Sequence, residues 1–442
     1  MIDQLVVLIG GREVATLECG ARGRWALRYT STWRGRGDAF PLSLSMPLAA
    51  REHSHDILEA WVWNLLPDNA AVLDRWARHF QVSARSPFAL VAHVGEDCPG
   101  AVQIVRPARV AALEQQEPFQ VAWLTEAELA ERLALLERDH AAWRAPQDTG
   151  WFSLAGAQPK TALLLHEGRW GVPQGRTPTT HILKPPIPGL DGHVENEHFC
   201  LSLARELGLP AASTEVEQFG EHRVIVVKRY DRVRTAELVA AAPSGREAER
   251  LRALATTRPI LRIHQEDGCQ ALGLLPTAKY QNEGGPGPED LAALLRDHSS
   301  RPAEDRSTLL DALVFAWVIG GTDAHAKNYA FLHGGGRRVR LAPLYDIAST
   351  LPYFPVQKLK LAMKVGGEYR LGFISTRHWE RLGEDIGLGA EATLERVRAL
   401  AETVEQSASV VAVRCREGGL EVSELARLIE ARATECARIV SM

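Results

Sequence analysis

The residues best suited to chemistry lie in a polar segment at residues 320–328, which reads GGTDAHAKN. Asp323 stands five residues before Asn328, and Asp346 follows eighteen residues after Asn328. In protein kinases, an Asp that accepts the proton of the substrate hydroxyl precedes a Mg²⁺-binding Asn by the same spacing, and a second Mg²⁺-binding Asp follows later in the chain. The spacing therefore predicts phosphoryl transfer, in which Lys327 neutralises charge on the transferred group.

Two other interpretations of this segment remain open. Asp, His and Asn often cap helices and stabilise turns. A metal hydrolase could instead use Asp323, His325 and Asp346, although the sequence has no paired-histidine spacing to support it. We favour the kinase-like interpretation because a hairpin and a second Asp follow the D-x₄-N pattern.

A small-residue loop upstream is a candidate phosphate-binding loop. Residues 151–161 read WFSLAGAQPKT and lead into an apolar strand. Small residues let backbone N–H groups approach phosphates, and Lys160 adds a positive charge. An ordinary turn would have a similar composition, so this motif is weak on its own. The candidate ATP-binding residues in it are Ala155, Gly156, Ala157, Gln158 and Lys160.

The ends of two expected strands supply further candidate ATP-binding residues. Lys184 ends a strand that Pro185 stops, and a kinase needs such a lysine on the ATP phosphates, oriented by a helix carboxylate. Glu197 is the preferred partner of Lys184, with Glu195 second, although a solvent-facing lysine is the simpler alternative. All eight lysines of the chain lie between residues 160 and 364, which favours a functional role for Lys184. A buried strand that turns polar suggests an adenine-contacting hinge at Lys228, Arg229 and Tyr230.

The elements needed to position these residues fall into three segments. Residues 1–106 read as an α+β subdomain, 119–231 as a sheet-containing nucleotide lobe and 232–442 as a helical lobe. The stretch 106–118 is polar and flanked by prolines, which is typical of a linker. Strands are expected at 2–18 (a hairpin), 24–30, 41–46, 100–105, 161–166, 169–172, 180–184, 214–219, 223–229 and 357–364. Helices are expected at 56–66, 70–80, 125–138, 195–207, 289–297, 306–321, 376–386, 390–407 and 422–440. Thr125 and Glu128 predict a capping box at the start of the helix at 125–138.

Composition excludes several classes of protein. The chain has 442 residues, 45% of them hydrophobic, and a net charge of −4, so it can bury a normal core and lacks the basic excess of a general nucleic-acid binder. Its six cysteines form no C-x-x-C pair, which argues against a zinc ribbon and fits reduced thiols. No apolar stretch approaches the length of a membrane helix. We therefore expect a cytoplasmic protein.

Several motifs together resemble the HipA family, the serine/threonine kinase toxins of bacterial HipBA toxin–antitoxin systems. They include SLAGAQPKTALL, TPTTHILK, QEDGCQALGL, KYQNEGGPG, GGTDAHAKN and LYDI, with PLSLSMPL and NLLPD nearer the N-terminus. The resemblance spans nearly the whole chain. It implies a two-lobed, protein-kinase-like α/β (α+β) fold, with an N-terminal α+β subdomain, a sheet-containing nucleotide lobe and an all-helical C-terminal lobe.

The resemblance also implies roles for individual residues. Asp323 should be the catalytic base, Asn328 and Asp346 should bind Mg²⁺, and Lys184 should contact the phosphates of ATP. Ser153 matches the serine that the family autophosphorylates to switch the kinase off. The nucleotide should also meet the loop at 155–160, the hinge at 228–230, His325 and Tyr345. Pro159 and Lys228 depart from the family pattern, and neither departure removes a catalytic group.

The implied partners follow from the same family. They are a HipB-like helix-turn-helix antitoxin, operator DNA reached through that antitoxin, and a protein substrate such as an aminoacyl-tRNA synthetase, glutamyl-tRNA synthetase in particular. No membrane partner is expected. Two rival functions remain open: an antitoxin-bound corepressor with little catalysis, and a kinase of a small molecule.

Overall fold

The computed structural model describes residues 3–20, 23–115, 117, 119–145, 147–148, 150–242, 244–336 and 338–441. The chain divides into two compact units, which are described separately. The first unit comprises Met1–Pro185, Glu217–Glu266 and His333–Arg337, and the second comprises Pro186–Val216, Asp267–Leu332 and Arg338–Met442. The first unit is built around sheets and the second mainly from helices, which confirms the mixed α+β expectation.

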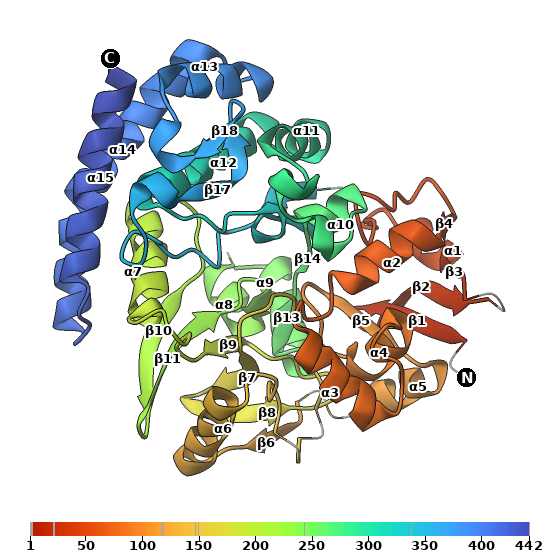
Figure 1. Cartoon of the computed structure of the whole chain (residues 1–442). Helices are drawn as coiled ribbons and strands as arrows, with labels where there is room; N and C mark the ends of the chain where they lie inside the picture. The colour runs from red at the N-terminus through yellow and green to blue at the C-terminus, as the bar shows by residue number, and fades with distance from the viewer. Residues whose placement is uncertain are drawn as a thin grey trace. The chain divides into compact units, whose positions relative to one another are not determined.

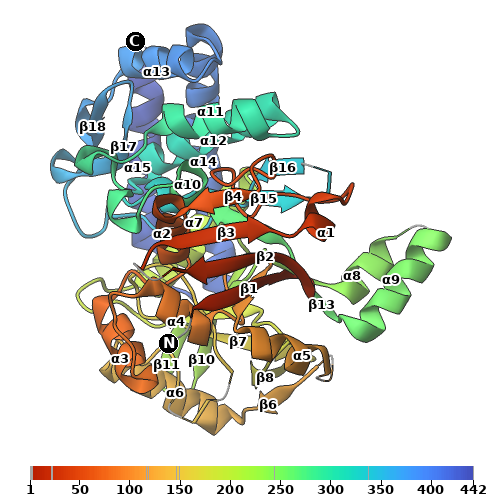
Figure 2. The same cartoon turned by 90° about the vertical axis from the view of Figure 1, so that its right-hand side faces the viewer.

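The N-terminal part of the first unit is a five-stranded sheet with the order β4-β3-β2-β1-β5 (Figure 2). Its apolar face packs with the helices around one core, in which Leu27, Trp61 and Met46 are fully buried. The strands are β1 (Gln4–Ile9), β2 (Arg12–Cys19), β3 (Trp25–Tyr29), β4 (Glu52–Ser54) and β5 (Val102–Val105). The helices are α1 (Ser31–Arg34), α2 (His55–Trp63), α3 (Ala70–Phe80) and α4 (Pro87–Val94).

A second sheet has the order β10-β11-β9-β7-β8-β6. Helix α6 (Glu126–Arg138) packs Leu129 and Leu133 against it, together with Leu183 and Val226 of the strands. Thr125 and Glu128 form the capping box at the start of α6, as the sequence predicts. The strands are β6 (Val121–Trp123), β7 (Thr161–His166), β8 (Arg169–Pro173), β9 (His181–Lys184), β10 (Thr214–Phe219) and β11 (His222–Lys228).

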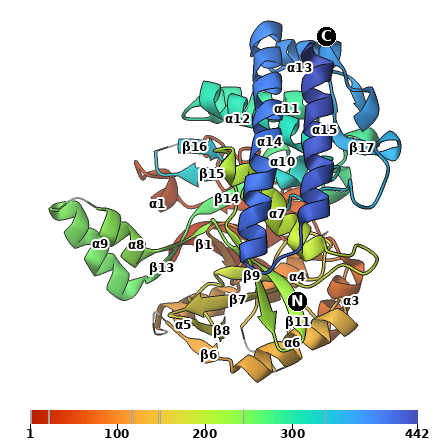
Figure 3. The same cartoon turned by 90° about the vertical axis from the view of Figure 1, so that its left-hand side faces the viewer.

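The second unit is organised around α12 (Pro302–Ile319), whose residues from Leu309 to Ile319 are all buried. The helices α14 (Ala390–Glu417) and α15 (Ser423–Ser441) lie side by side as a long hairpin (Figures 1 and 3). The other helices are α7 (His193–Glu206), α10 (Gly268–Leu272), α11 (Pro288–His298) and α13 (Thr376–Asp385). Short strands also occur here: β16 (Arg338–Leu341), β17 (Lys360–Val365), β18 (Glu368–Arg370) and most of β15 (Ala330–Gly334).

Three local predictions were wrong. Residues 41–46 form turns rather than a strand, because the Tyr29 hydroxyl donates to the Met46 carbonyl (2.8 Å) and accepts from the Leu42 N–H (2.8 Å). The expected linker contains α5 (Pro107–Gln115), although residues 116 and 118 lie outside the described part. The strand expected at 357–364 begins as a short 3₁₀ turn and becomes β17 only at Lys360.

Several helices were not anticipated. They are α1, α4, α10, α8 (Thr235–Ala241) and α9 (Arg246–Thr257), and the last two lie beside each other in Figure 2. Helices α8 and α9 each bury a single residue, Thr235 and Ala248 respectively. In the described part of the chain, no helix combines the length and the apolar character that crossing a membrane requires.

Candidate active site

Helix α12 positions the polar segment that carries the predicted catalytic residues. The helix ends at Gly320, which adopts φ +67°, and the Gly321 N–H donates to the Ala316 carbonyl at 2.7 Å. A residue with a side chain rarely adopts this left-handed conformation, so glycine allows the chain to turn sharply out of the helix. The buried helix therefore fixes where the segment after it begins.

The segment folds into a compact turn around the backbone of Asp323. The Asn328 Nδ2 group and the His325 N–H both donate to the Asp323 carbonyl, each at 2.8 Å, and the Asn328 N–H donates to the His325 carbonyl at 2.9 Å. Asn328 is buried, whereas the Asp323 side chain is 67% exposed. The turn thus presents the Asp323 carboxylate outward and leaves the Asn328 Oδ1 atom as the side-chain oxygen that can bind a cation.

His325 lies beside the Asp323 carboxylate. Its Nε2 atom is 3.9 Å from Asp323 Oδ2, and its ring packs edge to face against Tyr280 with centroids 5.0 Å apart. Burial lowers the pKa of His325, while the negative charges of Asp323 and Asp346 oppose that shift. The imidazole is therefore neutral at neutral pH and can exchange hydrogen bonds without adding a positive charge.

Asp346 reaches the same place from a separate part of the chain. It adopts φ +58°, a conformation that Asp tolerates better than most residues and that recurs at functional sites. The hydroxyl of its neighbour Tyr345 donates to the Lys327 carbonyl. The structure thus brings together Asp323, His325, Lys327, Asn328, Tyr345 and Asp346, all of which the sequence singled out.

The donor set fits Mg²⁺. Asn328 and Asp346 offer one amide oxygen and one carboxylate, and Mg²⁺ binds few protein oxygens together with substrate phosphates. The alternative of a metal hydrolase would need a richer protein ligand set. Among the described residues, no group of three or more His, Cys, Asp and Glu side chains is arranged to hold a metal.

In the first unit, the candidate phosphate loop is folded inward. Ser153 is fully buried, its hydroxyl donates to the Leu65 carbonyl at 2.6 Å, and its N–H donates to the Asp97 carbonyl at 2.8 Å. Lys160 Nζ donates to the Ala155 carbonyl at 2.8 Å and so closes the loop on itself. Gly156 adopts φ +99°, and a Cβ atom there would lie 2.6 Å from Lys160 Nζ.

The N-terminal subdomain holds this loop from outside. The Asp68 N–H donates to the Gly156 carbonyl at 3.0 Å, and Asn69 Nδ2 donates to the Ala157 carbonyl at 3.2 Å. Sequence reasoning missed these contacts, although the NLLPD motif that ends at Asp68 was recognised. The NLLPD motif alone did not indicate that this segment contacts the loop at residues 155–160.

The two strand ends differ in their surroundings. Lys184 is buried at the end of β9, opposite Ile225 of β11. The Lys228 side chain is half exposed, and its Nζ atom lies 3.5 Å from a carboxylate oxygen of Glu237. Lys184 belongs to the first unit and Glu197 to the second, so their pairing stays a prediction.

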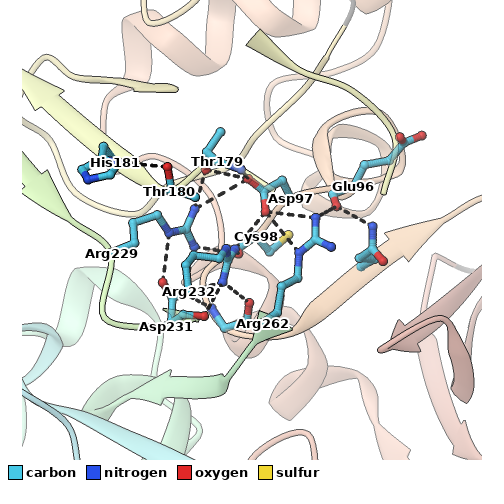
Figure 4. Close-up of polar contacts among 12 residues, drawn as sticks. Glu96, Asp97, Cys98, Thr179, Thr180, His181, Arg229, Asp231, Arg232 and Arg262 are labelled. Atoms are coloured by element: carbon cyan, nitrogen blue, oxygen red, sulfur yellow. Dashed lines mark hydrogen bonds and ion pairs between the residues drawn. The ribbon is translucent and has the colours of Figure 1, made fainter. Parts of the chain in front are cut away.

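Arg229, expected at the hinge, belongs to a buried ionic cluster that sequence reasoning did not foresee (Figure 4). Its guanidinium donates to both carboxylate oxygens of Asp231 (3.0 and 2.8 Å), and its backbone N–H donates to the Thr180 carbonyl at 2.9 Å. The arginine is therefore held by protein groups, and its backbone N–H is already used. A nucleotide contact at this strand would have to come from a neighbouring group.

Asp97 is the other acid of the ionic cluster, and it comes from the N-terminal subdomain. One of its oxygens accepts from Arg232 (2.8 Å) and Arg262 (3.3 Å), and the other accepts from the N–H and the hydroxyl of Thr179 (2.9 and 2.6 Å). Burial alone would raise the pKa of Asp97, but the charges of Arg232 and Arg229 outweigh it and lower that pKa. The carboxylate is thus ionised, and it ties the subdomain to Thr179, which lies just before β9.

Comparison with known proteins agrees with the fold and the motifs. Residues 5–105 match the family model described as the HipA N-terminal domain, and residues 152–408 match the HipA-like C-terminal domain. A Sinorhizobium fredii protein provisionally named kinase Y4mE is 34% identical over 405 residues, which are 91% of this chain and 90% of that protein.

Two of the comparisons lead to HipA of Shewanella oneidensis. One is with the protein named serine/threonine-protein kinase toxin HipA, which is 27% identical over 403 residues, 88% of this chain and 84% of that protein. The other comparison is with the solved complex of HipA, HipB and operator DNA, in which the matched chain has a TM-score of 0.80 at 24% identity, covering 99% of this chain and 98% of that one. The fold, the two family models and the assembled polar loop together lead to one conclusion: this chain belongs to the HipA family of serine/threonine-protein kinase toxins.

Proposed function

We propose that this protein transfers the γ-phosphoryl group of ATP to a serine or threonine of another protein and so acts as the toxin of a toxin–antitoxin pair. The observation that carries the proposal is the turn at 323–328, which presents an exposed Asp323 carboxylate beside Asn328 and Asp346. Bound Mg²⁺ would neutralise the phosphates and orient them for in-line transfer.

Each step of the transfer can be assigned to a group of this chain. The Asp323 carboxylate accepts the proton of the substrate hydroxyl as its oxygen attacks the γ-phosphorus, and ADP leaves. Asn328 and Asp346 would hold Mg²⁺, and Lys184 and the loop at 155–160 would contact the phosphates. Lys327, which is buried within the turn, would neutralise charge on the transferred phosphoryl group.

We further propose that Ser153 is an autophosphorylation site that switches the kinase off. Its hydroxyl is fully buried against the Leu65 carbonyl, so it must leave this position to be phosphorylated. Phosphorylation would add roughly two negative charges, which the buried position cannot accept without a partner. The modified loop would then stay away from the position seen here and could no longer bind ATP.

The proposed partners are a HipB-like helix-turn-helix antitoxin, and operator DNA through it. The support is the fold shared with the chain of the HipA–HipB–operator complex. The proposed target is an aminoacyl-tRNA synthetase, with glutamyl-tRNA synthetase as the first to test, because phosphorylating such an enzyme would stop translation and growth.

Expression without an antitoxin tests the toxin proposal. Wild-type protein should arrest growth, and Asp323→Gln should not, because the variant lacks the base. An Asp38→Asn variant, altered at an exposed ion pair, should arrest growth like the wild type. Equal toxicity of Asp323→Gln would favour the corepressor alternative, and label from ATP found only in small molecules of a lysate would favour the small-molecule kinase.

A further inference from the structure

Tyr280, which lies in the KYQNEGGPG motif, has no role in the chemistry described so far. Its hydroxyl donates a hydrogen bond of 2.8 Å to Asp323 Oδ1, and its ring packs edge to face on His325. Both partners lie in the turn that carries the proposed catalytic base. The motif and the turn are forty-three residues apart in sequence, so the fold must bring them together.

The backbone around Tyr280 is held tightly. Its carbonyl accepts from the N–H groups of Glu283 and Gly285, both at 3.0 Å. A Cβ atom on Gly285 would lie 2.7 Å from that carbonyl and closer still to the Ala278 carbonyl, so only glycine fits there. The next residue, Gln281, accepts from the Lys364 N–H of β17 at 2.6 Å. The Tyr280 ring is therefore presented from a fixed loop.

The same loop supports the catalytic turn directly. The Lys279 carbonyl accepts from the Ala326 N–H at 3.3 Å, and Lys279 Nζ lies 5.3 Å from the centre of the Tyr280 ring. The Asp323 side chain, in contrast, is two-thirds exposed and stands at the edge of the turn. Without an external contact, its carboxylate would rotate freely among several orientations.

We infer that Tyr280 is a positioning residue for the catalytic base: its hydroxyl fixes Asp323 Oδ1 so that Oδ2 faces the substrate hydroxyl. In the transfer, the substrate oxygen forms the new bond to the γ-phosphorus, the bond from that phosphorus to the β,γ-bridging oxygen breaks, and Asp323 Oδ2 takes the proton. Tyr280 keeps its own proton throughout. This inference rests on the proposed kinase activity.

The test compares wild type with Tyr280→Phe, which removes one hydroxyl and keeps the ring. Tyr369→Phe is the matched control, because that tyrosine stands in β18 of the same unit and its ring contacts Lys360 and Lys364. The measurements are the rate of label transfer from ATP to the protein itself and to casein, as functions of ATP concentration. Equilibrium binding of a non-hydrolysable ATP analogue and the thermal midpoint accompany them.

We expect Tyr280→Phe to lower the maximal transfer rate about 10- to 100-fold, the range for losing a hydrogen bond to a charged group. The affinity for the analogue and the ATP concentration at half-maximal rate should stay within twofold of the wild-type values. The thermal midpoint should stay within a few degrees of wild type. On an Asp323→Gln background, the same substitution should cause no further loss, because Tyr280 acts through Asp323.

The outcomes separate the two proposals. An active wild type with an equally fast Tyr280→Phe variant overturns this inference and leaves the kinase proposal standing. A variant that loses analogue affinity or stability in parallel with rate also overturns it, since the tyrosine would then be structural. A wild-type protein that transfers no label overturns both.

Discussion

Individual buried side chains couple the stability of this protein to pH. His264 is the clearest case: its Nε2 atom bonds the Leu42 carbonyl at 2.9 Å, and His333 packs beside it. Burial lowers the pKa of His264 to about 3, with the nearby His333 adding to the effect. The ring is thus neutral in the folded protein over the whole range in which a free histidine becomes charged.

This gives a pH prediction with a definite sign. The unfolded chain binds a proton at His264 below about pH 6.5, whereas the folded chain does not until about pH 3. Stability should therefore be complete above pH 6.5 and fall by up to about 1.4 kcal/mol per pH unit below it. Urea unfolding between pH 5 and 7.5 measures this, and His264→Gln should show a shallower slope. If the unfolding free energies of wild type and His264→Gln depended on pH with the same slope, His264 would not be a source of the pH dependence.

At the scale of elements, close backbone contacts hold the turn at residues 323–328, which carries the proposed catalytic base. Gly268 begins α10, and a Cβ atom there would lie 2.6 Å from the Ala326 carbonyl and 2.9 Å from a methyl group of Leu291. Helix α10 therefore packs against the turn with no room for a side chain. This contact was not visible in the sequence, where Gly268 was simply part of a motif.

Gly268→Ala should consequently push the turn away from α10. We expect a loss of about 1–3 kcal/mol in the free energy of unfolding, as for other overpacked sites, together with slower phosphoryl transfer. Gly37→Ala is the matched control, because a Cβ atom at Gly37 meets nothing within 4 Å. Denaturant unfolding and transfer rates check both variants, and equal behaviour of the two would show that the contact is not tight.

The ionic cluster of Figure 4 makes a second prediction at this scale. Asp97→Asn would leave Arg229 and Arg232 with the carboxylate of Asp231 and would remove the carboxylate that Arg262 pairs with. Breaking such a buried pair costs about 3–5 kcal/mol. Asp38→Asn is the control, because Asp38 pairs with Arg36 on the surface and such pairs contribute little. Thermal unfolding of the two variants should differ strongly, and a mild effect of Asp97→Asn would mean that water reaches the cluster.

Sequence patterns predicted some elements well and others poorly, for identifiable reasons. The capping box at Thr125 and the hairpin of β1 and β2 are local signals and are confirmed. Helix α8, which was not anticipated, spans only seven residues, and so short a segment shows no clear helical period. In the ionic cluster, Arg229 and Arg232 pair with Asp97, which lies in a distant segment that no local sequence pattern connects to them.

At the scale of the whole molecule, the candidate active site also combines features that local sequence patterns predict with contacts between distant segments that they do not predict. The D-x₄-N spacing and the later Tyr-Asp pair predicted which residues would lie together, and the second unit does assemble these six residues around one turn. Their roles in catalysis stay predictions. The sequence did not indicate that the N-terminal subdomain holds the phosphate loop through Asp68 and Asn69. Both the N-terminal subdomain and the rest of the kinase-like region match models of the HipA family.

The most direct test of the account is the intact mass of the whole protein, shown first to be unphosphorylated, after incubation with ATP and Mg²⁺. We predict a gain of one phosphate, about 80 Da, that maps to Ser153 by peptide analysis and is absent from Asp323→Gln. A gain that persists in Asp323→Gln would remove Asp323 as the base. No gain, with ATP shown to bind, would contradict the self-inactivating kinase.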